Sequence, residues 1–441
     1  MQIILLSGGS GKRLWPLSNG TRSKQFLKLL SAPDGSMESM VQRVVRQLVQ
    51  ANIDAPITIA TSASQQDAII AQLGNAVTIV AEPERRDTFP AIALASAYLV
   101  KEKRLADDEI VVVMPCDPYT DLSYFDTIKQ MAQQVEANLA DLVLMGIRPS
   151  EPSTKFGYLV PNPSNPMLIQ SFTEKPSRER ACQLLSQGAV WNGGVFAFRL
   201  GYLRQIIDKY LPDTSFTQFR ARYSELPKIS FDYEVAEKAT SVGVVYFNGA
   251  WKDLGTWDAL SRELSHSCIG LAFEHQCADT TAINELNIPL VCHGTTNLIV
   301  AASPDGILVA DKSRSDNLKQ PVGMLNQRPM YEARRWGTYR VIDNLEFPDG
   351  FCALTKQLTL IPGCSISYQR HACGDEVWTF IDGQGEIILD GHRSPVQRGT
   401  VITIPAGTLH ALRATSALTF IEVQRGTSLI EEDIQRFPFT W

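Results

Sequence analysis

The sequence predicts three parts: an α/β domain with a doubly wound sheet, a short β-rich segment, and a C-terminal β-barrel. Over residues 1–262, apolar β-rich runs alternate with helical patterns, which is typical of a parallel sheet covered on both faces by helices. Residues 263–328 hold short β-like pieces, interpreted as a connector with a rung or two of a solenoid, and a linker. In residues 329–441 short strand patterns alternate with turns at close spacing, which favours a sandwich or barrel.

Composition and charge exclude several classes of protein. A chain of 441 residues has room for two or three domains. Its net charge of −6 argues against a nucleic-acid-binding surface, and no apolar run is long enough to cross a membrane. The first residues lack a signal-peptide pattern, so we expect a cytoplasmic protein. The eight cysteines include no Cys-x-x-Cys pair and are expected to be free thiols.

The elements of the first domain follow from its apolar runs. Strands are expected at residues 3–6, 57–60, 77–81, 110–114 and 142–147, and helices at 39–50, 65–73, 90–103 and 125–138. Ligands of such sheets bind beyond the carboxyl ends of the strands. The glycine-rich loop after the first strand and Asp117 after the fourth should therefore lie at the same edge.

The glycine-rich loop is the first candidate site. Gly8, Gly9 and Gly11 follow the first strand, and Arg13 and Lys24 come soon after. Without a Cβ, successive glycines let backbone N–H groups converge on an anion. Arg13 and Lys24 would supply the positive charge that a polyphosphate needs. The alternative is a plain turn between strand and helix in which the glycines are incidental.

Two acidic residues are candidate metal ligands. Asp117 follows a strand, and Asp253 lies in a turn rich in glycine and tryptophan. Separated carboxylates suit Mg²⁺, which prefers oxygen ligands. With a polyphosphate nearby, they point to nucleotidyl transfer, a reaction that depends on positioning and charge neutralisation. Taken alone, each aspartate could equally be a turn residue or a helix cap.

A third group of residues suits a sugar phosphate. Gly157 would let a ligand approach the backbone closely, and Glu174 and Lys175 stand side by side where a strand is expected to end. Lys175 could hold the phosphate of the attacking sugar, while Glu174 and Asn192 could hydrogen-bond its hydroxyls. The alternative for Glu174 and Lys175 is a solvated turn.

Taken together, residues 1–260 resemble the sugar-nucleotide pyrophosphorylase family, in its mannose-1-phosphate guanylyltransferase branch. The matching stretches are residues 6–18, 24–27, 82–93, 156–158, 174–176, 191–192, 232–233 and 251–257. The resemblance implies a Mg²⁺-dependent reaction of GTP with mannose 1-phosphate that gives GDP-mannose, a polysaccharide precursor, and pyrophosphate. It also implies a nucleotide-binding role for Glu82, Arg86, Asp87 and Thr88.

The chain departs from the family pattern at several positions. The family usually has asparagine at Asp87, alanine at Phe89, and Tyr-Pro in place of Arg22-Ser23. Two alternatives therefore stay open: another sugar 1-phosphate or nucleotide, and a sugar-phosphate-binding module without activity. The retention of Asp117 and Asp253 argues against the second alternative.

The C-terminal part resembles a cupin barrel. A cupin carries His-x-His-x-x-Glu and then Pro-x-Gly-x-x-His, and these four side chains bind one divalent metal. Here the corresponding residues are His371, Cys373, Glu376 and His410. Because cysteine is a good zinc ligand, Zn²⁺ or another divalent metal could bind; the missing histidine is equally compatible with a lost site.

In bifunctional members of the branch this cupin is a phosphomannose isomerase, and the whole chain resembles that architecture. The isomerase usually has histidines and an arginine where this chain has Ala372, Cys373 and Gly374. Without the arginine, holding the phosphate or polarising the carbonyl should suffer. We therefore favour a degenerate cupin with a structural, oligomeric or regulatory role over an active isomerase, and a homo-oligomer is compatible with that role.

Overall fold

The computed structural model describes residues 1–9, 13–212, 214–325, 327–429 and 433–441. The chain divides into two compact units. The first contains residues 1–13, 23–66 and 73–265, and the second contains residues 14–22, 67–72 and 266–441. Among the described residues, no helix is both long and apolar enough to cross a membrane.

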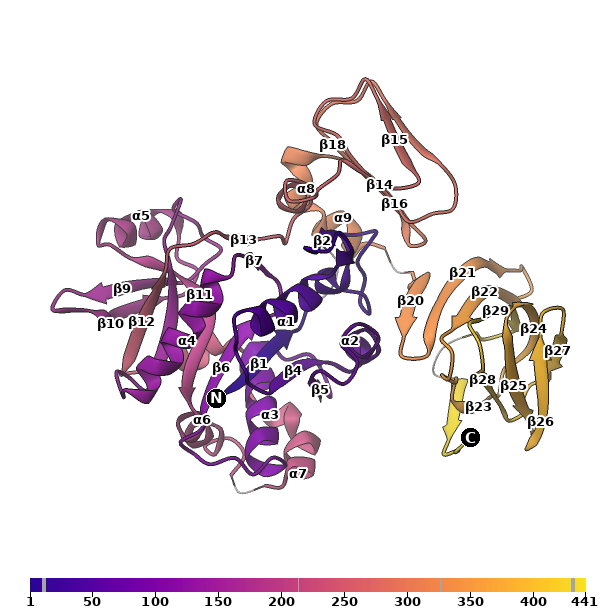
Figure 1. The fold of residues 1–441 in the computed structure, drawn as a ribbon, viewed down its shortest axis with the longest axis horizontal. Helices are drawn as coiled ribbons and strands as arrows, with labels where there is room; N and C mark the ends of the chain where they lie inside the picture. The colour runs from indigo at the N-terminus through magenta and orange to yellow at the C-terminus, as the bar shows by residue number, and fades with distance from the viewer. Residues whose placement is uncertain (10–12, 213, 326, 430–432) are drawn as a thin grey trace. The chain divides into compact units, whose positions relative to one another are not determined.

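The first unit is built on a nine-stranded sheet, with strand order β5-β4-β1-β6-β11-β8-β12-β10-β9 (Figure 1). Its strands are β1 (Gln2–Ser7), β4 (Ile57–Ser62), β5 (Thr78–Glu82), β6 (Ile110–Pro115), β8 (Leu142–Ile147), β9 (Tyr158–Asn162), β10 (Asn165–Thr173), β11 (Val190–Arg199) and β12 (Val242–Phe247). Strands β5, β4, β1 and β6 pair in parallel, as do β8 and β12. The sheet is mixed, because β11 runs antiparallel between β6 and β8.

Helices cover both faces of this sheet. The helices of the first unit are α1 (Met40–Gln50), α3 (Thr88–Lys101), α4 (Ser123–Glu136), α5 (Arg178–Ser186), α6 (Leu200–Ile207), α7 (Phe216–Ala221) and α8 (Trp257–Ser261), with the short 3₁₀ helices η1 (Lys24–Phe26), η2 (Ala63–Gln65) and η3 (Tyr223–Glu225) and the π-helix η4 (Asp232–Ala236). All but the first and last residues of α2 (Gln66–Leu73) belong to the second unit. In β6, Val111 and Val113 pack in one cluster with side chains of α3. The alternate residues Val112 and Met114 are equally buried, as expected when a strand is covered on both faces.

Two short pairs of strands complete the first unit: β2 (Leu30–Ser31) with β3 (Met37–Glu38), and β7 (Pro118–Thr120) with β13 (Trp251–Asp253). The second of these matters for the site, because it joins segments more than a hundred residues apart in the sequence.

The second unit contains a small solenoid after residue 266. Its strands are β14 (Cys268–Gly270), β15 (Ala272–His275), β16 (Thr281–Asn284), β17 (Leu290–His293), β18 (Leu298–Ser303) and β19 (Gly306–Asp311). Successive rungs pair in parallel, β14 with β16, β15 with β17, and β16 with β18, and β19 closes the stack as an antiparallel hairpin partner of β18. Ala272, Ala282, Cys292 and Val300 form the solenoid's buried cluster, and Leu290 and Leu298 pack against them.

A connector with η5 (Lys312–Asn317) and α9 (Lys319–Gly323) leads to the C-terminal domain. One sheet has the order β20-β21-β22-β29-β24-β27 and the other β26-β25-β28-β23-β30. The bounds are β20 (Tyr331–Arg334), β21 (Gly337–Glu346), β22 (Cys352–Leu360), β23 (Tyr368–His371), β24 (Gly374–Asp382), β25 (Gln384–Leu389), β26 (His392–Gln397), β27 (Val401–Ile404), β28 (His410–Ala414), β29 (Leu418–Gly426) and β30 (Ile434–Phe437). A core that includes Trp378, Phe380 and Phe420 fills the domain.

Two tight turns of this domain give a matched stability test. Gly383 and Gly391 have φ of +87° and +85°, but a Cβ at Gly383 would lie 2.0 Å from the carbonyl oxygen of Ala417, whereas one at Gly391 meets nothing within 4 Å. We expect Gly391→Ala to cost about 1 kcal/mol of unfolding free energy through its backbone alone, and Gly383→Ala to cost clearly more. Denaturant unfolding measures both; equal losses would contradict the steric account.

Candidate functional site

The carboxyl ends of β5, β4, β1 and β6 meet at one edge of the sheet, because these strands are parallel neighbours. Gly8 and Gly9 follow β1 there, and a Cβ at either position would meet nothing within 4 Å. The Gln65 amide donates to the carbonyl oxygen of Gly9 (3.2 Å), and the Gln25 amide donates to Ser7 Oγ (3.1 Å). The start of the loop is thus tied down while its glycines face open space. Gly11 lies outside the described residues.

Asp117 and Asp253 are brought together by the pairing of β7 with β13. In that ladder Asp253 stands opposite Pro118, the residue after Asp117. Lys24 lies between the two carboxylates, with its Nζ 2.8 Å from Asp117 Oδ2 and 3.0 Å from Asp253 Oδ1. The two predicted metal ligands and one predicted phosphate ligand therefore form a single charged cluster.

Charge balance holds this cluster together. Burial alone would lower the pKa of Lys24, but the charges of Asp117 and Asp253 outweigh it and raise that pKa, so the ammonium stays protonated. Burial would raise the pKa of Asp253, but Lys24 and then Arg13 lower it. Arg13 is also close in space, since a Cβ at Gly255 would lie 2.9 Å from Asp253 Oδ1 and 3.2 Å from an Arg13 Nη1.

A second polar cluster contains the residues predicted for the sugar phosphate. Lys175 Nζ lies 2.8 Å from Glu174 Oε1. The Asn192 backbone N–H donates to the carbonyl oxygen of Gly157 (2.8 Å), which places these two segments side by side. A Cβ at Gly157 would lie 2.4 Å from Glu174 Oε2, so only glycine leaves room for that carboxylate.

Asp232 belongs to the same cluster but was not among the predicted site residues. The Asn192 amide donates to Asp232 Oδ1 over 2.6 Å. Burial, and then the charge of Glu174, raise the pKa of Asp232 to about 6. The sequence carried a signal for it, since Asp232 and Tyr233 are part of the family resemblance, but nothing in the sequence indicated that Asp232 meets Asn192.

The segment predicted to bind the nucleotide runs from the end of β5 into α3. Glu82 closes β5, and burial raises its pKa to about 7 although Tyr223, Arg85 and a backbone N–H oppose the shift. Asp87 has a φ of +74° and caps α3 by accepting from the Thr88 N–H over 2.8 Å. Asparagine and aspartate both cap helices, so this departure from the family pattern keeps a side chain that can cap α3.

Arg86 and Thr88 have structural partners in this structure. Two guanidinium N–H groups of Arg86 donate to the carbonyl oxygen of Leu226, over 3.1 and 2.9 Å, and a third pairs with Glu84. Thr88 Oγ1 accepts from the Phe231 N–H over 2.8 Å. Both residues thus fasten the segment around residues 226–231 to the start of α3.

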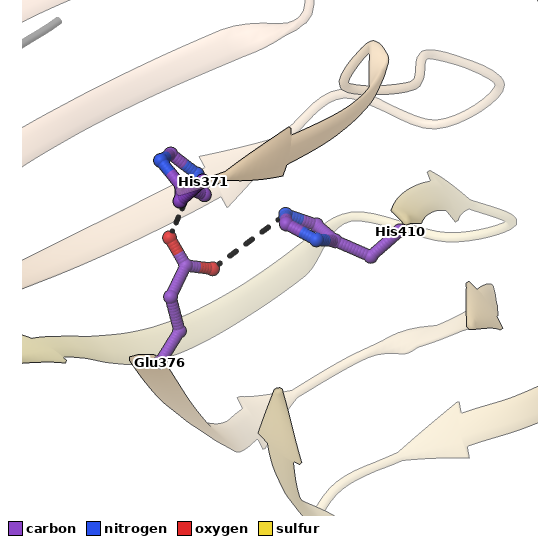
Figure 2. Close-up of side chains that lie close together, drawn as sticks. All are labelled: His371, Glu376 and His410. Carbon is purple, nitrogen blue, oxygen red and sulfur yellow. Dashed lines mark ion pairs between the residues drawn. The ribbon is translucent and has the colours of Figure 1, made fainter. Parts of the chain in front are cut away.

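The C-terminal domain brings three ligand-type side chains together (Figure 2). His371 closes β23, Glu376 lies in β24 and His410 begins β28. The Nε2 atoms of His371 and His410 lie 3.0 and 3.7 Å from the two carboxylate oxygens of Glu376, and all three ligand atoms lie within 4.8 Å of one another. A cavity of about 340 Å³ opens beside His371 and reaches Lys356 and Glu422.

The remaining contacts orient the three side chains. Trp378 Nε1 donates to Glu376 Oε2 (3.0 Å) and the Gln424 amide donates to Oε1 (2.7 Å). His410 Nδ1 lies 3.0 Å from the carbonyl oxygen of Thr408, which makes Nδ1 the donor and leaves Nε2 with its lone pair. That Nε2 is buried and has no hydrogen-bond partner among the described residues.

Cys373, the fourth predicted ligand, is not part of this group. The residue is exposed, and its backbone N–H donates to Asp433 Oδ2 over 3.0 Å. The side chains of Glu376 and the two histidines fit a divalent metal, because two imidazoles and one carboxylate are a common donor set and Nε2 of His410 faces Glu376 without a hydrogen bond among the described residues.

Known proteins resemble this chain over its whole length. The nucleotidyl transferase family model matches residues 2–267, and the model of the mannose-6-phosphate isomerase C-terminal domain matches residues 326–438. A protein of Klebsiella pneumoniae named mannose-1-phosphate guanylyltransferase is 30% identical, with 98% of this chain and 98% of the relative covered. The xanthan biosynthesis protein XanB of Xanthomonas campestris is also 30% identical, with 99% and 98% covered.

A solved structure from Thermus thermophilus, titled mannose-1-phosphate geranyltransferase, superposes with a TM-score of 0.60 at 29% identity. The superposition covers 73% of this chain and 98% of that chain. The predicted fold class, an α/β nucleotidyltransferase domain followed by a C-terminal cupin, is confirmed. The chain therefore belongs to the nucleotidyl transferase family and carries a C-terminal domain of the mannose-6-phosphate isomerase type.

Proposed function

We propose that the protein transfers the guanylyl group of GTP to mannose 1-phosphate, giving GDP-mannose and pyrophosphate for polysaccharide synthesis. The observation that carries this proposal is the cluster of Lys24, Asp117 and Asp253 beside the glycine loop. The names of the relatives, which include guanylyltransferases and a xanthan biosynthesis protein, support the same substrates. The cytoplasmic location and the homo-oligomer expected from the sequence stay predictions.

In this reaction an oxygen of the sugar phosphate attacks the α-phosphorus of GTP, and the bond from that phosphorus to the bridging oxygen of pyrophosphate breaks. Arg13 and Lys24 neutralise the phosphate charge that grows on the leaving group. Lys175 holds the phosphate of mannose 1-phosphate, and Glu174 and Asn192 hydrogen-bond its hydroxyls. The protein forms no covalent bond with substrate; it orients two anions that would otherwise repel each other.

Asp117 and Asp253 are the residues that would hold Mg²⁺. Their carboxylate oxygens already enclose a cation, the Lys24 ammonium, and hard oxygen ligands suit this ion. When bound, Mg²⁺ adds positive charge beside the triphosphate. Because Lys24 contacts the same two carboxylates, we propose that it leaves them when the nucleotide enters and turns to the phosphates.

For the C-terminal domain we propose a divalent metal bound by His371, Glu376 and His410, without isomerase activity. The buried Nε2 of His410 supports the metal. The absence of an arginine in the loop at Gly374 supports the lack of isomerisation, since an aldose–ketose isomerase must hold a phosphorylated sugar while a proton moves between adjacent carbons.

The reaction is tested by following pyrophosphate release from purified protein with Mg²⁺, each of four nucleoside triphosphates and a set of sugar 1-phosphates. GTP with mannose 1-phosphate should be the best pair. Release only with another nucleotide or sugar would change the assigned substrates, and no release with any pair would refute the proposed transferase activity.

Asp253→Asn keeps the shape of the side chain but removes the charge that Lys24 and a metal ion need. We expect turnover to fall by roughly a hundredfold or more with an unchanged far-UV circular dichroism spectrum. The matched control is Asp126→Asn on α4, a surface aspartate paired with Lys129, which should keep wild-type turnover. Wild-type rates in Asp253→Asn would rule out its role.

Lys24→Ala should act in two opposite directions. Turnover should fall, because a phosphate ligand is lost. Meanwhile the nucleotide-free protein should bind Mg²⁺ or Mn²⁺ about tenfold more tightly, since the competing ammonium is gone from Asp117 and Asp253. Titration calorimetry measures this affinity, with exposed Lys28→Ala as the charge-matched control. An unchanged affinity in Lys24→Ala would contradict the competition.

The metal content of the purified protein tests the C-terminal site. We expect His410→Gln and Glu376→Gln to lose a bound divalent metal that wild type retains after dialysis, because each removes one of three ligands. Cys373→Ser and the exposed-histidine control His392→Gln should keep it. Metal-free wild type, or loss in Cys373→Ser, would contradict the assigned ligands.

A further inference from the structure

The loop at residues 14–22 connects Arg13 to the segment that carries Lys24, and it belongs to the second unit, with the solenoid. One cation of the proposed nucleotide site, Arg13, therefore precedes the loop, and the other, Lys24, follows it. The contacts that hold the loop therefore bear on the spacing between those two cations.

The tip of the β18–β19 hairpin holds the first half of the loop. Ser303 Oγ donates to the carbonyl oxygen of Pro16 over 2.7 Å, and both residues are buried. The Asn19 amide donates to Asp305 Oδ2, also over 2.7 Å. Trp15 packs against the same tip so closely that a Cβ at Gly306 would lie 2.5 Å from its ring.

Glu285, just after β16, holds the second half. Both of its carboxylate oxygens accept from the Arg22 guanidinium, each over 2.8 Å. Such a two-fold contact fixes direction as well as distance. Arg22 also lies over the Tyr331 ring, 5.2 Å from its centroid. Arg22 stands two residues before Lys24, at a position where the family usually has another residue.

The loop between these anchors is stiff. Asn19 Oδ1 accepts from the backbone N–H groups of Thr21 (3.0 Å) and Arg22 (2.8 Å), and the Asn19 N–H donates to the carbonyl oxygen of Arg22 (2.8 Å). These hydrogen bonds fix the backbone conformation of residues 19–22, so the contacts of Glu285 and Asp305 hold this whole segment and not one side chain each.

We propose that Glu285 and Asp305 of the solenoid are positioning residues for nucleotidyl transfer: by fixing Arg22 and Asn19 within the loop, they set the spacing between Arg13 and Lys24, the two cations at the ends of that loop. This inference rests on the proposed function. It assigns the solenoid a role in GTP binding and none in binding the sugar phosphate, whose ligands Lys175 and Asn192 lie elsewhere in the chain.

The test compares Glu285→Ala with a control that breaks an ion pair of the same solenoid. Lys312 is buried and pairs with Asp279 (2.6 Å), and neither residue touches the loop in any described contact. We expect Glu285→Ala to raise the KM for GTP about tenfold, which corresponds to about 1.4 kcal/mol, and to leave the KM for mannose 1-phosphate within about twofold. Lys312→Ala should leave both KM values near wild type.

Two further measurements separate positioning from loss of structure. The charge-swapped double variant Arg22→Glu with Glu285→Arg should restore the KM for GTP to within about threefold of wild type. Amide hydrogen exchange of residues 14–22 should accelerate in Glu285→Ala and not in Lys312→Ala. Equal effects of Glu285→Ala and Lys312→Ala, or a matching rise in both KM values, would overturn the proposal.

The same variants keep this inference separable from the proposed function. If wild type shows no turnover with any pair of substrates, the proposed function fails. Amide exchange of residues 14–22 and the affinity for GTP, measured by calorimetry, then still test the role of Glu285. Faster exchange with weaker GTP binding in Glu285→Ala supports the positioning role, and unchanged values for both refute it.

Discussion

The proposed site of the first unit depends on the electrostatic interaction of two carboxylates with one ammonium group. Asp117 and Asp253 would repel each other unscreened if nothing positive stood between them, and Lys24 supplies that charge at 2.8 and 3.0 Å. Two carboxylates this close are stable only with a cation between them. In the structure an amino group of the protein satisfies it; in the proposed catalytic state a metal ion does, and the lysine is released for the phosphates.

The residues that build this site come from distant parts of the chain, and different forces place them. Strand pairing between β7 and β13 places the acids. The parallel order of β1 and β6 places the glycine loop beside them. The two cations lie at the ends of a loop that is bonded to the solenoid through Arg22 and Asn19. The site of the C-terminal domain is built separately, from two histidines that face one buried glutamate.

Much of the fold could be predicted because it depends on local pattern. Strands such as β6 and β8 are buried on both faces, so they stand out as continuous apolar runs, and their predicted bounds agree with the structure to within a residue or two. Long-range pairing could not be predicted this way: nothing near Asp253 indicates that it lies beside residue 118, nor that Asn192 meets Asp232. The antiparallel insertion of β11 and the position of Cys373 outside the histidine–glutamate group likewise depend on tertiary packing.

The central claim is that an oxygen of the sugar phosphate attacks the α-phosphorus of GTP, so that the bond to pyrophosphate breaks. Mannose 1-phosphate labelled with ¹⁸O in its phosphate tests it most directly, with mass spectrometry of the products. The account predicts that every labelled oxygen is found in GDP-mannose and none in pyrophosphate, because the bond that breaks belongs to GTP. Label in pyrophosphate, or its loss to water, would contradict the account.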